Sequence, residues 1–424
     1  MRLPEPLIRA VHERLIERLD LRRTAVDGMA DGELRRLARQ HLERIVADHA
    51  LPPDVERDTL VRLLLQEVVG LGPLEDLLAD DSVSEIMVNG AEVVFVERGG
   101  RLVRTALQFS SERALLGVIE RLLQPTGRRV DESSPMVDAR LPDGSRINVV
   151  VPPLAIRGPA VTVRKFARRR IGIAELVRAG SLSPAMAEFL SMAVRERRNI
   201  VVSGGTGAGK TTLLNALSDL IPDDERVVTI EDSAELQLLH PNLVVLEARP
   251  RNLEGRGQVT IRELVRNALR MRPDRIVVGE CRGGEALDML QAMNTGHSGS
   301  LTTAHANSPR DLLLRLEVMV LMSGMDLPLA AVREQVASAV NLIVQQARFP
   351  CGLRRVVRIA EVTGTESGRI QLQDLFRFET TGTDDVGATE GRFVACGNVP
   401  VFLDGASPER RRREAERFAS GRQP

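Results

Sequence analysis

Residues 199–214 read NIVVSGGTGAGKTTLL, and this stretch decides the fold of the second half of the chain. The apolar run at 200–203 predicts a buried strand, the glycines after it predict a tight turn, and the residues from Lys210 onward predict a helix. Gly204, Gly209, Lys210 and Thr211 fill the pattern G-x-x-x-x-G-K-[ST], in which backbone N–H groups surround a phosphate chain. The positive end of the helix dipole adds to this attraction for phosphate.

The loop is specific enough to predict a nucleoside triphosphate site. Lys210 is one of only two lysines, the other being Lys165, among 58 basic residues. A chain of this composition matches the pattern by chance roughly once in a thousand cases. The predicted ligand is a nucleoside triphosphate with Mg²⁺, and at this point GTPase, kinase and transporter functions all stay open. The alternative is a glycine-rich turn without a ligand. The residues predicted to bind the nucleotide are Gly204, Gly205, Thr206, Gly207, Ala208, Gly209, Lys210, Thr211 and Thr212, with the Thr211 hydroxyl as a Mg²⁺ ligand.

Composition places the chain among ordinary globular proteins of two or three domains. It has 424 residues, of which 43% are hydrophobic and 27% charged. The formal net charge is +0, and the chain has 10 Phe, no Trp and no Tyr, so a nucleic-acid partner is not expected. The three cysteines form no C-x-x-C pair, which favours a reducing cytoplasm. No signal peptide or membrane-spanning run is found, so any membrane association is expected to be peripheral.

The order of patterns along the chain predicts an α/β protein with a smaller α+β domain before the P-loop domain. Helical periodicity covers residues 1–75, and short β-rich runs with a helix at 111–124 and a hairpin turned at 143–144 cover residues 76–168. An Arg-rich segment then predicts a linker at 169–182. Strands and helices alternate in the second half, at 200–203, 213–220, 226–230, 261–271, 275–279 and 284–294, which predicts a parallel sheet covered on both faces. This domain is expected over 183–405, followed by an Arg-rich tail at 406–424 that is expected to be a solvated helix or a loose segment.

Two acidic strand ends are candidates for chemistry. RIVVGE at 275–280 is an apolar strand that ends in Glu280, the layout of a Walker B strand. Both strand ends are expected at one edge of the sheet, so Glu280 is predicted to order the attacking water or to hold Mg²⁺, directly or through a water molecule. VVTIED at 227–232 repeats the layout with Glu231 and Asp232. Capping of a helix is the alternative role for this second pair.

Histidines and arginines supply the other candidates. NTGHSGSLTTAHAN at 294–307 contains His297 and His305, and its position after a strand favours a sensor of the γ-phosphate, with a hydrogen-bonded turn as the alternative. The eight-residue separation does not indicate a zinc site. Arginines supplied from another domain or subunit could act on the transferring phosphate. The candidates singled out for this role are Arg140, Arg146, Arg164, Arg270 and Arg272.

Several stretches together resemble one family, the ATPases of type II and type IV secretion machines. They are GGTGAGKTTLLNAL at 204–217, TIEDSAELQL at 229–238, the segment 272–311 around TGHSGSLTTAH, and DARLPDGSRIN with VTVRKF at 138–148 and 161–166. The resemblance is closest to the tight-adherence (Flp) pilus branch, the CpaF/TadA kind. It implies a RecA-like ATPase domain, a hexameric ring, and nucleotide bound between two domains.

The resemblance also implies roles for the candidate residues. Glu280 would be the hydrolytic carboxylate, Glu231 part of an acidic box, and His297 and His305 a histidine box. Arg140, Arg146 and Arg164 would reach the phosphates. We therefore expect a cytoplasmic ATP-hydrolysing motor at the inner or cell membrane that acts on a polytopic membrane platform in pilus assembly or protein secretion. A conjugation or type IV secretion ATPase, a nucleotide-gated scaffold with little hydrolysis, and a nucleic-acid motor are the alternatives.

Overall fold

The computed structural model describes residues 31–48, 56–166, 170–249, 251, 256–383, 389–405 and 407–418. The chain divides into two compact units, unit 1 at Met1–Arg168 and unit 2 at Arg169–Pro424. Each unit is described by itself below. Among the described residues, no helix combines the length and apolarity needed to cross a lipid bilayer.

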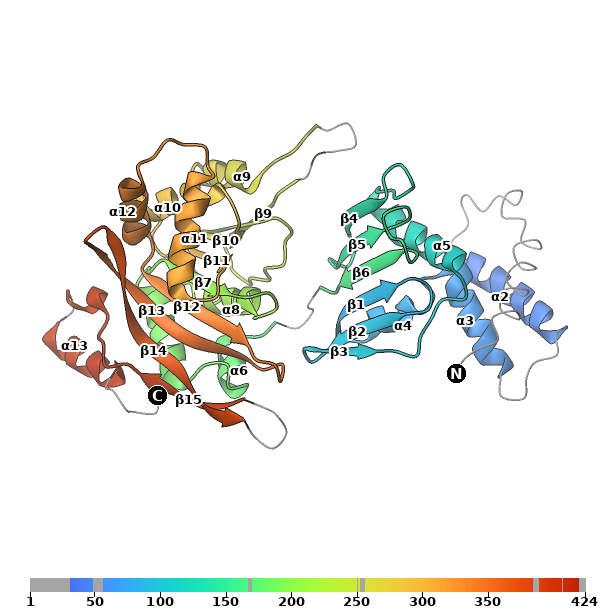
Figure 1. The fold of residues 1–424 in the computed structure, drawn as a ribbon, viewed down its shortest axis with the longest axis horizontal. Coiled ribbons are helices and arrows are strands. Elements are labelled where there is room, and N and C mark those ends of the chain that lie inside the picture. Colours follow the sequence, from blue (N-terminus) through green and yellow to red (C-terminus); the bar gives the residue numbers. More distant parts are fainter. Residues whose placement is uncertain are drawn as a thin grey trace. The chain divides into compact units, whose positions relative to one another are not determined.

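Unit 1 is built on an antiparallel sheet of six strands in the order β3-β2-β1-β6-β5-β4 (Figure 1). Helix α5 covers one face, because its apolar side chains and alternate residues of the strands form one core cluster. Ser111 caps α5 by accepting a hydrogen bond from the Ala114 amide. The elements are α2 (Asp31–Ala47), α3 (Arg57–Val69), α4 (Leu74–Ala79), β1 (Val83–Asn89), β2 (Val94–Arg98), β3 (Arg101–Arg104), α5 (Glu112–Leu123), η1 (Gln124–Thr126), β4 (Met136–Arg140), β5 (Arg146–Val150) and β6 (Ala160–Arg164).

Unit 2 contains a sheet of nine strands in the order β15-β14-β13-β12-β7-β11-β10-β8-β9 (Figure 1). The part from β12 to β9 is parallel, and β13 to β15 add to it antiparallel. The elements are α6 (Ile173–Arg178), α7 (Pro184–Arg195), β7 (Ile200–Gly204), α8 (Lys210–Ser218), β8 (Val227–Glu231), β9 (Leu243–Glu247), α9 (Ile261–Ala268), β10 (Arg275–Cys281), α10 (Glu285–Asn294), β11 (Leu301–His305), α11 (Pro309–Leu321), α12 (Leu329–Ala339), β12 (Leu342–Arg348), β13 (Arg354–Glu366), β14 (Arg369–Thr383), β15 (Thr389–Ala395), η2 (Val401–Leu403), α13 (Pro408–Ala415) and η3 (Glu416–Phe418).

Helices cover both faces of the parallel part of this sheet, as predicted. Ile200 and Val202 of β7 pack with α6, α7 and α8, whereas Val201 packs with the cluster formed by α9 to α12. Neighbouring residues of one strand point to opposite faces, so a continuous apolar run serves two cores. The α/β fold class predicted from the sequence is confirmed.

Two predicted segments belong to the body of unit 2 instead. The linker predicted at 169–182 contains α6, and Leu176 and Leu182 are buried in a core cluster of unit 2. The predicted solvated tail contains α13, and Phe418 is fully buried in the same cluster. Both segments are rich in arginine, so their composition did not indicate that they pack against the core. A few apolar side chains are enough to hold a short helix there. The first 30 residues of the predicted helical region lie outside the described residues, and helix α4 extends past the predicted boundary at residue 75.

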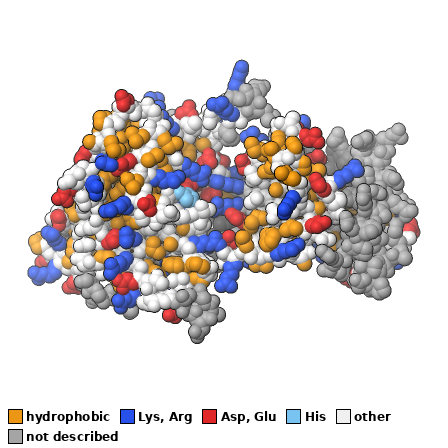
Figure 2. Space-filling model, in the orientation of Figure 1, with side chains coloured by type: hydrophobic (Ala, Val, Ile, Leu, Met, Phe, Trp, Pro, Cys, Tyr) orange, Lys and Arg blue, Asp and Glu red, His pale blue; other side chains and the backbone are white. Residues whose placement is uncertain are grey.

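One helix of unit 2 exposes an apolar stripe, which we call the α11 stripe. It consists of Leu314, Val318 and Leu321 on α11 and of Met322 and Met325 just after it, and the exposed fractions of these residues lie between 46% and 66%. Figure 2 shows hydrophobic side chains gathered over α11 and α12 on the visible face of this unit. The opposite side of α11, including Leu312 and Leu316, is buried in the core. The helix is therefore apolar on both sides, which marks an interaction surface.

Candidate nucleotide site

The loop between β7 and α8 has the backbone of a phosphate-binding turn. Gly207 and Gly209 have φ values of 70° and 97°, a region that favours glycine. A Cβ atom on Gly204 would collide with the carbonyl oxygen of Gln346 on β12. The backbone therefore favours glycine at each of these positions. The amino end of α8 faces the loop.

Lys210 begins α8 and its ammonium lies over the loop. Its Nζ donates to the carbonyl oxygens of Gly204 at 3.2 Å and Gly205 at 3.1 Å, and it lies 3.4 Å from Nδ1 of His305. The side chain is buried, with 8% of the residue exposed. A single positive charge held this way at a helix amino end fits a phosphate chain.

His305 connects the loop to Glu280. Its Nε2 lies 3.0 Å from Oγ1 of Thr206, and its Nδ1 lies 2.7 Å from Oε1 of Glu280. His305 ends β11 and Glu280 lies near the end of β10, and these parallel strands are neighbours beside β7. Parallel strands present their carboxyl ends at the same edge, so three separate stretches of sequence meet at one site.

Glu280 is held as an ionised carboxylate. Burial raises the pKa of Glu280, but hydrogen bonds from His305 and Arg282 and the charges of Arg282 and Lys210 outweigh it, so the pKa is lowered from its usual value. Arg282 donates to Oε2 through Nε at 2.8 Å and through Nη2 at 2.6 Å. Both carboxylate oxygens therefore have a cationic or imidazole partner.

Glu231 lies at the end of β8 and is 3% exposed. Its Oε1 accepts from the amides of Glu235 at 2.9 Å and Leu236 at 3.0 Å. A Cβ atom on Gly279 would approach the Glu231 Cγ to 2.8 Å, so the absence of a side chain there makes room for it. The observed contacts hold the chain after β8 in place, and a direct role of Glu231 with the nucleotide stays a prediction.

His297 lies at the other edge of the sheet, because it precedes β11 while His305 ends that strand. The amides of Gly299 and Ser300 donate to Oδ1 of Asn199, just before β7, at 2.7 Å and 3.1 Å. Within the described residues of one chain, the structure does not bring His297 together with His305. A shared role of the two histidines therefore stays a prediction.

The three candidate arginines of unit 1 form a row. Arg146 on β5 pairs with Arg140 on β4 and with Arg164 on β6. Residues directly opposite one another on paired strands share a face, so the three side chains leave the sheet together at one end. Arg164 also lies 3.8 Å from Glu85. Three guanidinium groups at one register position form a surface suited to an anion. Arg270 and Arg272 lie between α9 and β10, before the strand, whereas Glu280 lies near its end.

Sequence reasoning missed four residues around the P-loop. Arg354 of β13 donates from Nε to the Gly207 carbonyl oxygen at 2.8 Å, and Nη1 of Arg348 would lie 3.0 Å from a Cβ atom on Gly207. Gln346 is 2% exposed and its amide lies beside Gly209, while Arg282 contacts Glu280. These residues carry no motif. The pairing of β12 with β7 and β13 brings Arg348, Arg354 and Gln346 to the loop, and that long-range pairing has no local signal in the sequence.

These residues fit a nucleoside triphosphate with Mg²⁺. The loop supplies glycine backbone, an amino-terminal helix end and a lysine, and arginines from two further strands surround it. Thr211 and Thr212 occupy the first turn of α8. No group of three or more His, Cys, Asp or Glu side chains that could hold a metal ion is found in the described part of the chain. A Mg²⁺ ion bound mainly through phosphate oxygens needs only one or two protein oxygens, for which Thr211 and Glu280 are the candidates.

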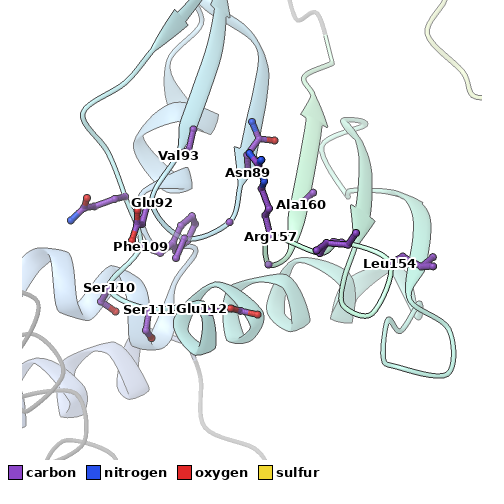
Figure 3. Close-up of a pocket in the computed structure, with 16 residues that line it drawn as sticks. Asn89, Glu92, Val93, Phe109, Ser110, Ser111, Glu112, Leu154, Arg157 and Ala160 are labelled. Atoms are coloured by element: carbon purple, nitrogen blue, oxygen red, sulfur yellow. The ribbon is translucent and has the colours of Figure 1, made fainter.

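A separate cavity of about 1230 Å³ lies in unit 1 (Figure 3). Its walls come from the β1–β2 turn, the segment before α5 and the β5–β6 loop, and it includes Asn89, Glu112 and Arg157. Asn89 pairs with Ala160 at one end of the sheet, whereas the arginine row includes Arg164 at the other end of β6. The cavity is therefore distinct from the arginine row.

Comparison with known proteins agrees with this architecture. The fold and the site define a P-loop nucleotide-binding domain of the RecA-like class. The model of the family described as "Type II/IV secretion system protein" matches residues 67–385, and this protein belongs to that family.

Two relatives and one solved structure show the extent of the similarity. The putative conjugal transfer protein Rv3659c of Mycobacterium tuberculosis is 41% identical over 341 residues, which cover 79% of this chain and 96% of that protein. The probable conjugal transfer protein TrbB of Sinorhizobium fredii is 37% identical over 316 residues, covering 73% and 92%. The X-ray structure of the Yersinia pseudotuberculosis ATPase DotB matches with a TM-score of 0.50 at 15% identity and covers 87% of each chain, a likeness of fold alone.

Proposed function

We propose that this protein hydrolyses ATP with Mg²⁺ and that the hydrolysis drives a bacterial secretion or conjugation machine or the assembly of a pilus. The observation that carries the proposal is the continuous set of contacts from Lys210 and Thr206 through His305 to Glu280. These contacts join the loop that would hold the phosphates to the carboxylate that would order the attacking water.

The site residues take the following roles in this proposal. Lys210 contacts the β- and γ-phosphates, and the bound Mg²⁺, held by Thr211 and by Glu280 directly or through water, would neutralise phosphate charge. Glu280 orients the water, and His305 links the position of Glu280 to that of the P-loop. The row of Arg140, Arg146 and Arg164 supplies positive charge to the phosphates. Glu231 supports the site through the backbone after β8, and His297 belongs to the proposed histidine box.

The names of the relatives favour one class of machine. Both relatives described above are named conjugal transfer proteins, and others at 32% identity are named type IV secretion system protein VirB11. We therefore propose conjugation or type IV secretion as the leading context. The tight-adherence pilus branch, favoured by the resemblance of the motifs, is the second candidate.

We further propose that the protein acts as a homo-oligomeric ring, with a hexamer as the expected size. It would work in the cytoplasm against a polytopic platform protein of the inner or cell membrane. The exposed α11 stripe supports assembly, because an apolar face of this kind calls for a partner. Conformational change coupled to contacts with the γ-phosphate would convert hydrolysis into movement.

Glu280→Gln tests the enzymatic part of this proposal. We expect the variant to bind a fluorescent ATP analogue as the wild type does, but to lose ATP turnover by about 100-fold or more, since an amide cannot accept a proton from water. Turnover is measured as phosphate release by the purified oligomer at saturating ATP. Glu366→Gln, an exposed carboxylate at the end of β13, is the matched control and should keep full activity.

Two outcomes separate the alternatives. Tight nucleotide binding with equal, near-zero turnover in the wild type and Glu280→Gln would contradict the ATPase and favour a nucleotide-gated scaffold. Lys210→Ala should abolish binding of the analogue, because it removes the cation from the loop.

A further inference from the structure

Arg282 makes a close contact with Glu280 that the hydrolytic role of Glu280 does not require. Two nitrogens of its guanidinium, Nε and Nη2, donate to the same oxygen, Oε2, at 2.8 Å and 2.6 Å. Charge-assisted bonds of this length are among the stronger contacts in proteins. The Glu280 side chain is 19% exposed, whereas the Arg282 side chain is 60% exposed, so the arginine reaches the carboxylate from the solvent side.

The backbone of Arg282 is fixed, although its side chain is exposed. Its amide donates to Oε1 of Glu285 at 2.6 Å, and the Gly283 amide donates to the same oxygen at 2.8 Å. Glu285 begins α10, so the turn between β10 and α10 is held by a single carboxylate. The guanidinium can therefore change partner without movement of the chain that carries it.

A second carboxylate lies within reach of Arg282. Nη1 of Arg282 lies 4.0 Å from Oδ2 of Asp232, which directly follows β8 and has a side chain that is 64% exposed. The guanidinium thus stands between Glu280 and Asp232, bonded to the first and in longer contact with the second. Two acceptors for one cation provide the two arrangements that a switch needs.

The bond to Arg282 opposes the chemistry proposed for Glu280. A carboxylate that orients and activates water needs an accessible oxygen and enough basicity to accept a proton. Arg282 donates two hydrogen bonds to Oε2, so the lone pairs of this oxygen are engaged and it is not open to a water molecule. Arg282 is also the most exposed of the three side chains around Glu280, the others being His305 and Lys210.

We propose that Arg282 is a positioning residue that restrains Glu280 in a resting arrangement, and that its transfer toward Asp232 frees Oε2 for the attacking water. This inference rests on the proposed ATPase function. Water would attack the γ-phosphorus and ADP would leave, with Glu280 as the group that orients the water. The restraint limits the basal rate of hydrolysis. It does not affect nucleotide binding, which depends on the P-loop.

Arg282→Gln and Asp232→Asn should change the rate in opposite directions. Arg282→Gln removes the restraint, so we expect kcat for ATP at pH 8 to rise by about threefold to tenfold with little change in KM. Asp232→Asn removes the alternative acceptor and should lower kcat by a similar factor. Arg282→Lys keeps the positive charge, so its kcat should stay close to the low basal kcat of the wild type. Arg178→Gln, an exposed arginine of α6, is the control and should match the wild type.

The kcat and KM values separate this role from a structural one. The charged groups that face Glu280 are Arg282 beside it, His305 on β11 and Lys210 on α8. Arg282→Gln removes the contact with Oε2 of Glu280 and leaves the contact with His305, so kcat should rise while KM stays close to the wild-type value. A variant that only loosened the fold would lower kcat, and Arg282→Lys would not return it toward the wild-type value. Adding Glu280→Gln to Arg282→Gln should abolish turnover.

Each result decides between the inference and the function on which it rests. Active wild type with an equal or slower Arg282→Gln overturns the restraint and leaves the ATPase. If the wild type is inactive and Arg282→Gln is active, the restraint is supported, and it blocks hydrolysis completely rather than in part. If both are inactive while a fluorescent ATP analogue binds to both, the ATPase and the restraint fall together.

Discussion

At the scale of single residues, Arg275 is a charged side chain of unit 2 whose burial has to be offset by hydrogen bonds. It is fully buried and bonds to both carboxylate oxygens of Glu225, through Nε and, at 3.2 Å, through Nη2. It also donates to the carbonyl oxygens of Gly299 at 3.0 Å and Val194 at 2.8 Å. These bonds join the end of α7, the segment before β8 and the loop before β11. A buried charge of this kind is tolerated because its N–H groups donate to a carboxylate and to backbone carbonyl oxygens.

Arg275→Met should therefore be strongly destabilising. Glu225 would stay buried with only the half-exposed Arg197 as a cationic partner, at 3.3 Å, and we expect a loss of about 3–5 kcal/mol in the free energy of unfolding. The double variant Arg275→Met with Glu225→Gln should recover part of this loss, because no unpaired carboxylate remains. Calorimetric unfolding of the three proteins measures the effect. A double variant no more stable than Arg275→Met would show that the buried charge is not the cause.

Site residues that belong to a local sequence pattern could be predicted as candidates, and residues outside such a pattern could not. Lys210, His305 and Glu280 follow apolar strands, and their expected proximity is what the structure shows. Arg282 and Arg275 have no such signal, because all but two of the 58 basic residues are arginines and no single one stands out. Their roles follow from which strands become neighbours.

At the scale of elements, apolar runs located the strands around the nucleotide site closely. The strand predicted at 200–203 is β7, and the helix predicted after the glycine-rich turn begins at Lys210. β9 has no specific prediction, since its residues are half-exposed rather than a buried run. The segment at 173–178 is helical where a linker was expected, and the segment at 408–415 forms a helix, one of the two forms expected for the Arg-rich end.

Phe418 tests whether α13 and η3 belong to the body of unit 2. Its ring lies 5.4 Å from that of Phe189 and 5.3 Å from that of Phe376, between centroids. Phe418→Ala should lower the free energy of unfolding by about 3–5 kcal/mol, because it leaves a cavity among these rings. The measurement is the shift in the calorimetric transition.

Arg411→Ala is the matched control on α13. Arg411 pairs with Asp404 at 2.7 Å, but both side chains are more than half exposed, so the change should stay within about 1 kcal/mol. A Phe418→Ala protein that unfolds at the wild-type temperature would mean that the helix is not anchored by this ring.

At the scale of the whole molecule, the division into an α+β region and a larger P-loop region could be predicted from the change in rhythm along the chain. Period-two runs and a hairpin turn mark unit 1, and alternation of strands and helices marks unit 2. The α11 stripe could not be predicted, because buried and exposed apolar residues of one helix look alike in sequence. Only the packing of Leu312 and Leu316 shows which side of α11 is already covered.

The last prediction concerns assembly through the α11 stripe. Val318 and Met322 are 54% and 66% exposed on the side of α11 that the core does not cover. Replacing both with Asp should leave the fold intact but weaken self-association by about tenfold or more, since two charges would have to be desolvated at the interface. Light scattering after gel filtration, over a range of protein concentrations, measures the mass of the assembly, and circular dichroism checks the fold. Val401→Asp, at an exposed apolar residue of η2, is the control and should assemble as the wild type does. An unchanged oligomer in the double variant would exclude the α11 stripe as a contact between subunits, while a loss of both mass and ATP turnover would tie hydrolysis to the assembled form.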